Sequence, residues 1–385
     1  MIFYRRTRMK IMHLSDLHLG RRIMEFSMIE DQEYILREIG RIADDEEPDA
    51  VVIAGDIYDK AVPSAEAVQL FDRFLVRNAG KGRKILVISG NHDSPERIAF
   101  GGRLMEISGV FLSPVYDGTV KPVSLEDAYG SVSFYLLPFL KPAHVRRFFP
   151  DEETESYTDA MRTAIRHMEI DPSVRNVLVT HQFVTGACRS DSEEVSVGGA
   201  DNIDASVFEP FDYTALGHLH SPQDTAPGIR YCGTPLKYSF SEVNQQKSVT
   251  IVEFGEKGVR NIRTVPLHPL HDMRVITGTY MEVTAQDFYR GTRTDDYLQV
   301  ILKDEEDIPC ALSRLRTIYP NIMKLSYDNC RTRAGFEITE EPPAEKMPPV
   351  ELFADFYQKQ NNAPMTEEQR KFVEELMEKI GDEDR

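Results

Sequence analysis

The chain has 385 residues, a formal net charge of −18 and 41% hydrophobic residues. That length allows a large buried core and predicts two or three domains. No apolar run approaches the length of a membrane span, which excludes a membrane-spanning protein. The four cysteines are widely spaced and form no C-x-x-C pair. We therefore expect reduced thiols and a cytoplasmic location, with neither a disulfide framework nor a zinc site.

Residues 1–8 are basic and irregular, and no apolar segment follows them as it would in a secretory signal. The first predicted strand begins at Lys10, so translation starts naturally at either Met1 or Met9.

Five short apolar runs within the first 220 residues predict strands, because such runs bounded by Gly, Asp or Pro are typical of strands buried on both faces. Polar groups at the carboxyl ends of these strands converge on one edge of an open α/β sheet. Asp, Asn and His side chains there would supply ligands for divalent metals such as manganese. The runs are Lys10–Leu14, Ala50–Ala54, 84–89, 176–179 and 213–216, and the polar clusters that follow them are DLH (16–18), GDIYD (55–59), GNHD (90–93), TH (180–181) and GHLH (217–220).

The five clusters together predict a site for two metal ions. They offer more ligands than the four to six that one ion needs, and a carboxylate can bridge two cations. A single D-x-H pair is more often a turn, and a single GHxH more often a solvated loop, but five such clusters in succession leave little room for that interpretation. The histidines outside the clusters are expected to be core or surface residues; they are His13, His144, His167, His268 and His271.

The order of the motifs, D-x-H, GD-x-x-D, GNHD, a lone His and GHxH, resembles that of the calcineurin-like metallophosphoesterases. The resemblance implies an α/β (α+β) fold in which a two-sheet β-sandwich is flanked by helices. It also implies two divalent ions, manganese or alternatively magnesium, that activate a water for attack on a phosphoester. By resemblance, one ion would be held by Asp16, His18, Asp56 and His220, and the other by Asn91, His181 and His218 with Asp56 as the bridge.

Three further residues of these motifs receive roles in the same way. His92 would protonate the leaving oxygen, a general-acid role suited to imidazole near neutral pH. Asp59 is expected to accept a hydrogen bond from His92 and to fix its tautomer, although some relatives carry His at this position. Asp93 is expected to be a turn residue or to support a ligand from outside the metal shell.

Beyond the metal motifs, four segments resemble the SbcD nucleases, the bacterial counterparts of the meiotic-recombination nuclease. Small-substrate phosphodiesterases lack the last of these segments. The resemblance covers essentially the whole chain and implies double-strand exonuclease activity in the 3′–5′ direction and endonuclease activity on single strands and hairpins. It further implies regulation by the SbcC ATPase, a homodimer within a heterotetramer, and association with the bacterial nucleoid. The segments are HLSDLHLG (13–20), VGGAD (197–201), FDYTALGHLH (211–220) and GTPLKYSFSE (233–242).

The pattern divides the chain into three parts: 1–269 as the nuclease domain, 270–340 as a small α/β capping domain that positions DNA, and 341–385 as a Pro-rich linker and C-terminal helices. The capping domain is predicted from strands 273–280, 296–303 and 321–327 with helices 285–289 and 309–318. The helices at 350–359 and 366–380 have apolar stripes that we expect to dock onto SbcC, although packing onto the chain itself is the alternative. In the first domain, a hairpin is predicted at 248–254 and 259–266 and helices at 28–44, 64–78 and 94–107. The last two helices are expected to form the homodimer contact, although their apolar faces could equally be ordinary core.

The negative charge conflicts with a DNA enzyme, because phosphate backbones are normally met by a basic face. Much of the acid is concentrated in short segments, and bound metals would offset the carboxylates of the site. Arg21, Arg22 and Lys237 are candidates for DNA contact near the motifs. We expect weak intrinsic affinity for DNA that a partner protein supplements.

Two other functions compete with this interpretation. A phosphodiesterase or phosphatase for small phosphate esters would need neither the capping region nor the C-terminal helices. A non-catalytic scaffold would tolerate a degenerate metal cluster, whereas every motif position is filled here. The chain contains no G-x-x-x-x-G-K-[ST] segment, so any ATP dependence must come from the partner.

Overall fold

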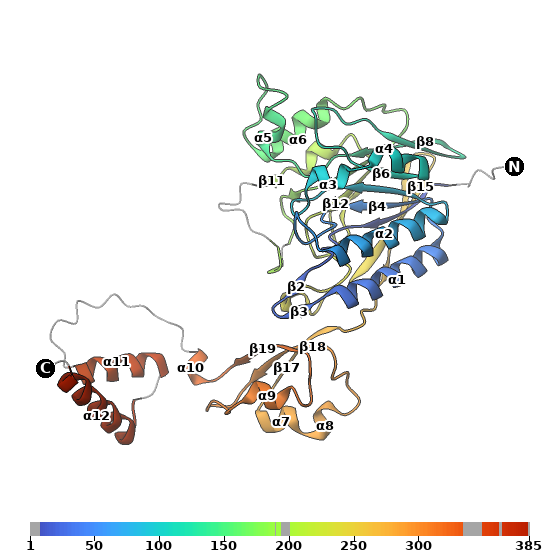
Figure 1. Cartoon of the computed structure of the whole chain (residues 1–385). Helices are drawn as coiled ribbons and strands as arrows, with labels where there is room; N and C mark the ends of the chain where they lie inside the picture. Colours follow the sequence, from blue (N-terminus) through green and yellow to red (C-terminus); the bar gives the residue numbers. More distant parts are fainter. Residues whose placement is uncertain (1–7, 189, 194–200, 334–348, 362–363, 384–385) are drawn as a thin grey trace. The chain divides into compact units, whose positions relative to one another are not determined.

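The computed structural model describes residues 8–188, 190–193, 201–333, 349–361 and 364–383 (Figure 1). The chain forms two compact units, Met1–Met273 and Arg274–Arg385.

The first unit is built on two six-stranded sheets. In each sheet the central strands are parallel, which is typical of sheets covered on both faces. In order across the sheets, the first contains β16 (Gly258–Pro266), β15 (Ser248–Gly255), β1 (Lys10–Leu14), β4 (Ala50–Ala54), β5 (Lys84–Ile88) and β6 (Val110–Leu112), and the second contains β13 (Gln223–Ala226), β14 (Ile229–Tyr231), β12 (Tyr213–Gly217), β9 (Arg175–His181), β8 (Gly130–Leu136) and β7 (Val123–Asp127).

The two sheets pack face to face across one hydrophobic cluster. Val52 and Leu86 of the first sheet share this cluster with Phe134, Val177 and Ala215 of the second. Side chains alternate between the two faces of a strand, so the neighbouring residues of the second sheet face the other way. The sandwich predicted from the motif resemblance is therefore present.

Helices cover the outer faces of the sandwich. α1 (Ile29–Glu46) and α2 (Ala65–Gly80) lie side by side, and α2 packs against β5 (Figure 1). α2 begins where the hydroxyl of Ser64 accepts a hydrogen bond from the amide of Ala67, the usual N-cap arrangement. The predicted helices 28–44 and 64–78 thus form, each displaced by one or two residues.

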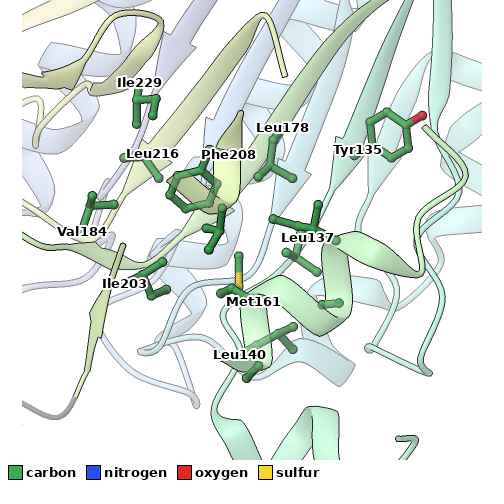
Figure 2. Packing of buried hydrophobic residues seen from close by; sticks show 14 of the residues in the cluster. Tyr135, Leu137, Leu140, Met161, Leu178, Val184, Ile203, Phe208, Leu216 and Ile229 are labelled. Atoms are coloured by element: carbon green, nitrogen blue, oxygen red, sulfur yellow. The ribbon is translucent and has the colours of Figure 1, made fainter. Parts of the chain in front are cut away.

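A second hydrophobic cluster lies on the outer face of the second sheet (Figure 2). Leu178 and Leu216 of the sheet contact it, as do Leu137 and Leu140 from the loop after β8 and Met161 from α6 (Tyr157–Arg166). α5 (Pro142–Arg146) lies between that loop and α6 along the chain, and two short strands, β10 (Phe183–Val184) and β11 (Asn202–Ile203), pair in parallel at the same cluster.

The prediction of one continuous helix over 94–107 is wrong. The segment is divided into α3 (Pro95–Ala99), α4 (Gly102–Met105) and a 3₁₀ turn (Glu106–Ser108). Gly101 has φ +73°, a left-handed conformation that interrupts a helix and that glycine adopts at little cost. The other short elements of the unit are a β2 (Arg22–Ile23) and β3 (Phe26–Ser27) hairpin and 3₁₀ turns at Ala205–Phe208 and Phe240–Glu242.

The second unit contains a three-stranded sheet, β17 (Met273–Gly278), β18 (Tyr297–Leu302) and β19 (Ile322–Tyr327). Its core includes Leu298, Val300 and Leu315. The predicted helix 285–289 forms as α8 (Gln286–Tyr289). A helix that was not predicted, α7 (Tyr280–Thr284), precedes it and begins at a capping box of Thr279 and Glu282. The helices of this unit are α7 (Tyr280–Thr284), α8 (Gln286–Tyr289), α9 (Ala311–Leu315), α10 (Cys330–Arg333), α11 (Pro349–Asn361) and α12 (Glu367–Glu383).

Most of the predicted Pro-rich linker, residues 341–348, lies outside the described residues. α11 and α12 are connected by an ion pair between Arg370 and Glu351 (2.6 Å). In the part of the chain that the structure describes, no helix has the length and apolarity needed to cross a membrane.

Candidate metal centre

The predicted ligands meet at the carboxyl ends of five strands, three from one sheet and two from the other. β1, β4 and β5 lead into the D-x-H, GD-x-x-D and GNHD clusters, while β9 ends at His181 and β12 at Gly217. His181 and Gly217 are register partners in the second sheet. Parallel strands thus place segments from the whole length of the unit at one end of the sandwich.

Three glycines allow these strand ends to approach one another. A Cβ atom on Gly217 would lie 1.9 Å from the carbonyl oxygen of Ala54, and one on Gly90 would lie 2.1 Å from Oδ1 of Asp56. A Cβ on Gly55 would lie 2.5 Å from Nδ1 of His181. Side chains at these three positions would separate the metal-binding segments, which explains why glycine precedes the polar residues in these motifs.

Four predicted ligands have a left-handed backbone. The φ angles are +53° at Asp16, +44° at His18, +48° at Asp56 and +103° at His218. Such conformations cost on the order of 1–3 kcal/mol each in residues other than glycine and cluster at functional sites. These four backbone conformations therefore lower the stability of the fold, and they direct the four side chains toward the candidate metal centre.

The first group of donors comprises Asp16, His18 and His220, whose ligand atoms lie within 4.8 Å of one another. Nε2 of His18 lies 3.2 Å from Nε2 of His220 and 3.7 Å from Oδ2 of Asp56. The side chains of these residues are buried, so water does not screen the contacts.

The second group contains His181, His218 and Asn91. Nδ1 of His181 donates to the carbonyl oxygen of Ala54 (2.9 Å), which makes Nε2 an acceptor in the neutral ring. That nitrogen lies 2.9 Å from Oδ1 of Asn91 and 3.3 Å from Oδ2 of Asp56. Nδ1 of His218 lies 3.0 Å from the same oxygen of Asn91. A cation among these acceptor atoms would satisfy them together.

The electrostatics of the site also favour bound cations. Burial, reinforced by the charge of Asp56, raises the pKa of Asp16 to about 7. Burial alone would lower the pKa of His181, but the charge of Asp56 outweighs it and raises that pKa to about 9. Burial lowers the pKa of His18 well below its usual value. Two buried carboxylates surrounded by imidazoles therefore fit a pair of divalent ions, and Oδ2 of Asp56 lies near a histidine of each group, His18 and His181.

His92 lies beside the two groups, with Nε2 3.9 Å from Oδ2 of Asp56. Its backbone amide donates to Oδ1 of Asp56 (2.9 Å), and Nδ1 lies 3.1 Å from the backbone carbonyl oxygen of Asp59. Asp59 therefore accepts the expected hydrogen bond from His92 through its backbone carbonyl, which can fix the tautomer of His92. Its carboxylate accepts a hydrogen bond from Arg21 (3.2 Å).

Asp93 is a turn residue, as predicted. Its carboxylate accepts hydrogen bonds from the amides of Ile57 and Tyr58 (both 3.0 Å) and of Gly90 (2.9 Å). It thereby ties the GD-x-x-D and GNHD loops together. His13, also outside the ligand set, is buried and contacts the hydroxyl of Tyr213 (2.9 Å).

The three candidate DNA-contacting residues differ in how they are engaged. Arg21 binds Asp59 and the carbonyl of Ser192 and lies over the ring of Tyr238. Lys237 pairs with Asp272 (2.9 Å), and Arg22 donates to the carbonyl of Glu25 on the surface. Arg21 and Lys237 are therefore held by the protein itself.

Sequence reasoning missed a buried network around His220. The hydroxyl of Ser192 contacts Nδ1 of His220 and donates to Glu242, whose Oε1 lies 3.6 Å from the same nitrogen. Lys247 pairs with Glu242 (2.6 Å) and donates to the carbonyl oxygen of His220 (2.8 Å). These contacts hold Nδ1 on the protein side and leave Nε2 toward the other donors.

Two further residues fix the loop that carries His18. The amide of Gln32, on α1, donates to the carbonyl of His18 (2.8 Å), and the hydroxyl of Tyr238 donates to that of Leu17 (2.7 Å). Tyr238 and Glu242 belong to segment 233–242, the most diagnostic part of the sequence resemblance. The sequence of this segment indicated that it matters for function, but only the fold shows which of its side chains reach the metal centre.

Comparison with known proteins agrees with this geometry. The model of the calcineurin-like phosphoesterase family matches residues 9–222, and that of the "Type 5 capsule protein repressor C-terminal domain" matches residues 269–361. The chain therefore belongs to the calcineurin-like phosphoesterases.

Curated relatives indicate which group of calcineurin-like phosphoesterases this chain is similar to. The chain is 32% identical to the SbcD component of the SbcCD nuclease of Staphylococcus epidermidis over 377 residues, which are 96% of this chain and 98% of that protein. It is also 32% identical to the protein of the same name from Staphylococcus saprophyticus over 374 residues, with the same coverage. A solved structure of a dimetal phosphatase from Danio rerio aligns over 68% of this chain and 99% of its own, at 10% identity and a TM-score of 0.36.

Proposed function

We propose that this chain is the nuclease component of an SbcCD-type DNA repair complex and that it hydrolyses DNA phosphodiesters at a two-metal centre. The observation that carries the proposal is the convergence of carboxylate, imidazole and carboxamide donors around Asp56, whose Oδ2 lies 3.7 Å from Nε2 of His18 and 3.3 Å from Nε2 of His181. Similarity over nearly the full length to curated SbcCD nuclease components supports DNA as the substrate.

Asp16, His18 and His220 would hold one ion, and Asn91, His181 and His218 the other, with Asp56 between them. When bound, two divalent ions, manganese in our proposal, polarise a phosphoryl oxygen and lower the pKa of water enough to supply a nucleophile near neutral pH. The chain's own contribution is to hold these donors in a largely buried setting where charge interactions are strong.

His92 acts as the general acid in this proposal. Hydrogen bonding of Nδ1 to the carbonyl of Asp59 leaves Nε2 as the atom that exchanges a proton with the leaving oxygen. Its side chain is 20% exposed, whereas those of His18 and His181 are fully buried, so substrate can reach it. Asp59 acts through Arg21 and its own backbone carbonyl and does not contact the substrate.

The C-terminal helices would bind the SbcC ATPase. In α11 and α12, large apolar side chains are exposed, which is unusual for helices without a partner. In the first unit, exposed apolar side chains on and near α2 and α4 would form the homodimer contact within a heterotetramer at the bacterial nucleoid. The two sets are Leu352, Phe353, Phe356, Phe372 and Leu376, and Val68, Val76, Phe100, Leu104 and Ile107.

The test is a nuclease assay with manganese on linear and hairpin duplexes, with and without SbcC. We expect basal cleavage of exposed ends by the chain alone and cleavage of hairpins that depends on SbcC and ATP. Hydrolysis of a simple phosphodiester without any cleavage of DNA would instead indicate an enzyme for small phosphate esters. A variant that lacks residues 350–385 should keep basal cleavage and lose SbcC in co-purification.

A further inference from the structure

A small cavity of about 150 Å³ opens beside the second donor group. Asn91 and His218 form its side toward the metal centre, and Phe139, Tyr157 and Phe183 supply aromatic walls. The ring of Phe139 is stacked on the imidazole of His218, at an interplanar angle of 20° and a centroid distance of 6.4 Å. The cavity is therefore continuous with the metal centre.

The aromatic walls rest on the hydrophobic cluster of Figure 2. Leu137 and Leu140 are anchored in that cluster, while Phe139, between them in the sequence, is half-buried and lines the cavity. Tyr157 and Phe183 also pack against the cluster from its edge. Three separate elements are thus held in place by one core, so the cavity is preformed.

Charged groups at the cavity are arranged asymmetrically. Lys141 is exposed and follows directly after the anchored Leu140, whereas the carboxylate of Asp201 belongs to the buried wall. Burial, assisted by the charge of Asp201, raises the pKa of Tyr157, which keeps its phenol neutral at physiological pH. A phosphate inside the cavity would be repelled by Asp201, but one at the mouth would meet Lys141.

We propose that this cavity is a nucleobase subsite, which takes a base of the DNA strand adjacent to the phosphate held at the metal centre. Aromatic walls suit the faces of a neutral base, and stacking of this kind tolerates every base. Lys141 then contacts the backbone phosphate next to that base. This inference rests on the proposed nuclease function and names the part of the substrate that distinguishes DNA from small phosphate esters.

The experiment compares two substrates of the full-length chain loaded with manganese, a single-stranded oligonucleotide and a strand of the same length built from abasic residues, which has no ring to stack. Tyr157→Leu should raise the KM for the oligonucleotide by about 5- to 150-fold, the range for loss of one stacked base. Tyr157→Phe, which keeps the ring, should remain near wild type. Neither variant should change kcat/KM for the abasic strand or the manganese content. Phe139 is left intact because it contacts His218.

Tyr129→Leu is the matched control, since Tyr129 is an exposed tyrosine in the β7–β8 turn, at the other end of β8 from the cavity loop. A second set of substrates carries a single abasic residue, placed at successive positions of the oligonucleotide. With the wild-type chain, the abasic residue should raise KM at one position by about as much as Tyr157→Leu does. With that substrate, Tyr157→Leu should raise KM no further.

Equal losses on both substrates, or no loss on the oligonucleotide, would overturn the subsite. Wild-type turnover of bis(p-nitrophenyl) phosphate without any cleavage of DNA would overturn the proposed nuclease function itself, and is a separate result.

Discussion

Replacement of Glu242 by Gln should weaken metal binding without touching a metal-ligand side chain. Glu242 is fully buried, and its carboxylate links Ser192 and Lys247 to Nδ1 of His220. Groups that orient a metal-bound histidine from behind are typically worth 10- to 100-fold in affinity. We therefore expect the manganese affinity of the site that includes His220 to fall by about that factor, while the affinity of the other site stays unchanged.

The same substitution should also lower stability, because it leaves the ammonium of Lys247 buried without its charged partner. Removing one partner of a buried ion pair costs about 3–5 kcal/mol. Asp127→Asn provides a matched control, since Asp127 and Arg175 form a comparably buried pair (2.7 Å) outside the metal centre. Metal affinity is measured by isothermal titration calorimetry and stability by denaturant unfolding of the metal-free chain. If Glu242→Gln loses stability like the control but keeps wild-type affinity at both sites, the orienting role is refuted.

Three further predictions follow from particular contacts. His92→Ala should lower cleavage by about 10²- to 10⁴-fold while manganese content, measured by mass spectrometry, stays unchanged; loss of metal would make His92 a ligand. Asp59→Asn should reduce turnover far less than His92→Ala in the same assay, because His92 contacts the Asp59 backbone carbonyl, and an equal loss would contradict this. Burial opposes ionisation of Asp127, but hydrogen bonds from Arg175 hold its pKa below the ordinary 3.8. Since the folded pKa is the lower one, the pair stabilises fully above the unfolded pKa and less as pH falls, so the stability difference between wild type and Asp127→Asn should shrink below about pH 4 in denaturant titrations.

Most strands of the sandwich, and the residues that gather at the candidate metal centre, could be predicted from the sequence because both depend on local patterns. Each apolar run ends directly at its polar cluster, so placing the strand also places Asp16, Asp56 or His181 at the sheet edge. Glycines in the motifs indicate positions where two strand ends come too close for a side chain, as Gly217 does to the carbonyl oxygen of Ala54.

Other features could not be predicted, because they depend on tertiary contacts and backbone geometry that a sequence pattern does not reveal. A backbone carbonyl has no sequence signature, so the sequence alone could not show that Asp59 meets His92 through its carbonyl oxygen and Arg21 through its carboxylate. Glu242 reaches His220 across 22 positions of the chain, a distance that only tertiary packing sets. The break at Gly101 arises because its left-handed conformation prevails over the apolar periodicity around it.

In the proposed mechanism, DNA cleavage requires two metal ions, and Asp56 would contribute to holding both. The most direct test is one titration of the metal-free chain with manganese, in which bound ions per chain and the rate of duplex cleavage are measured on the same samples. We expect two ions per chain in the wild type, with cleavage rising as the second ion binds. Cleavage that saturates at one ion per chain, or two bound ions without cleavage of DNA, would contradict this mechanism.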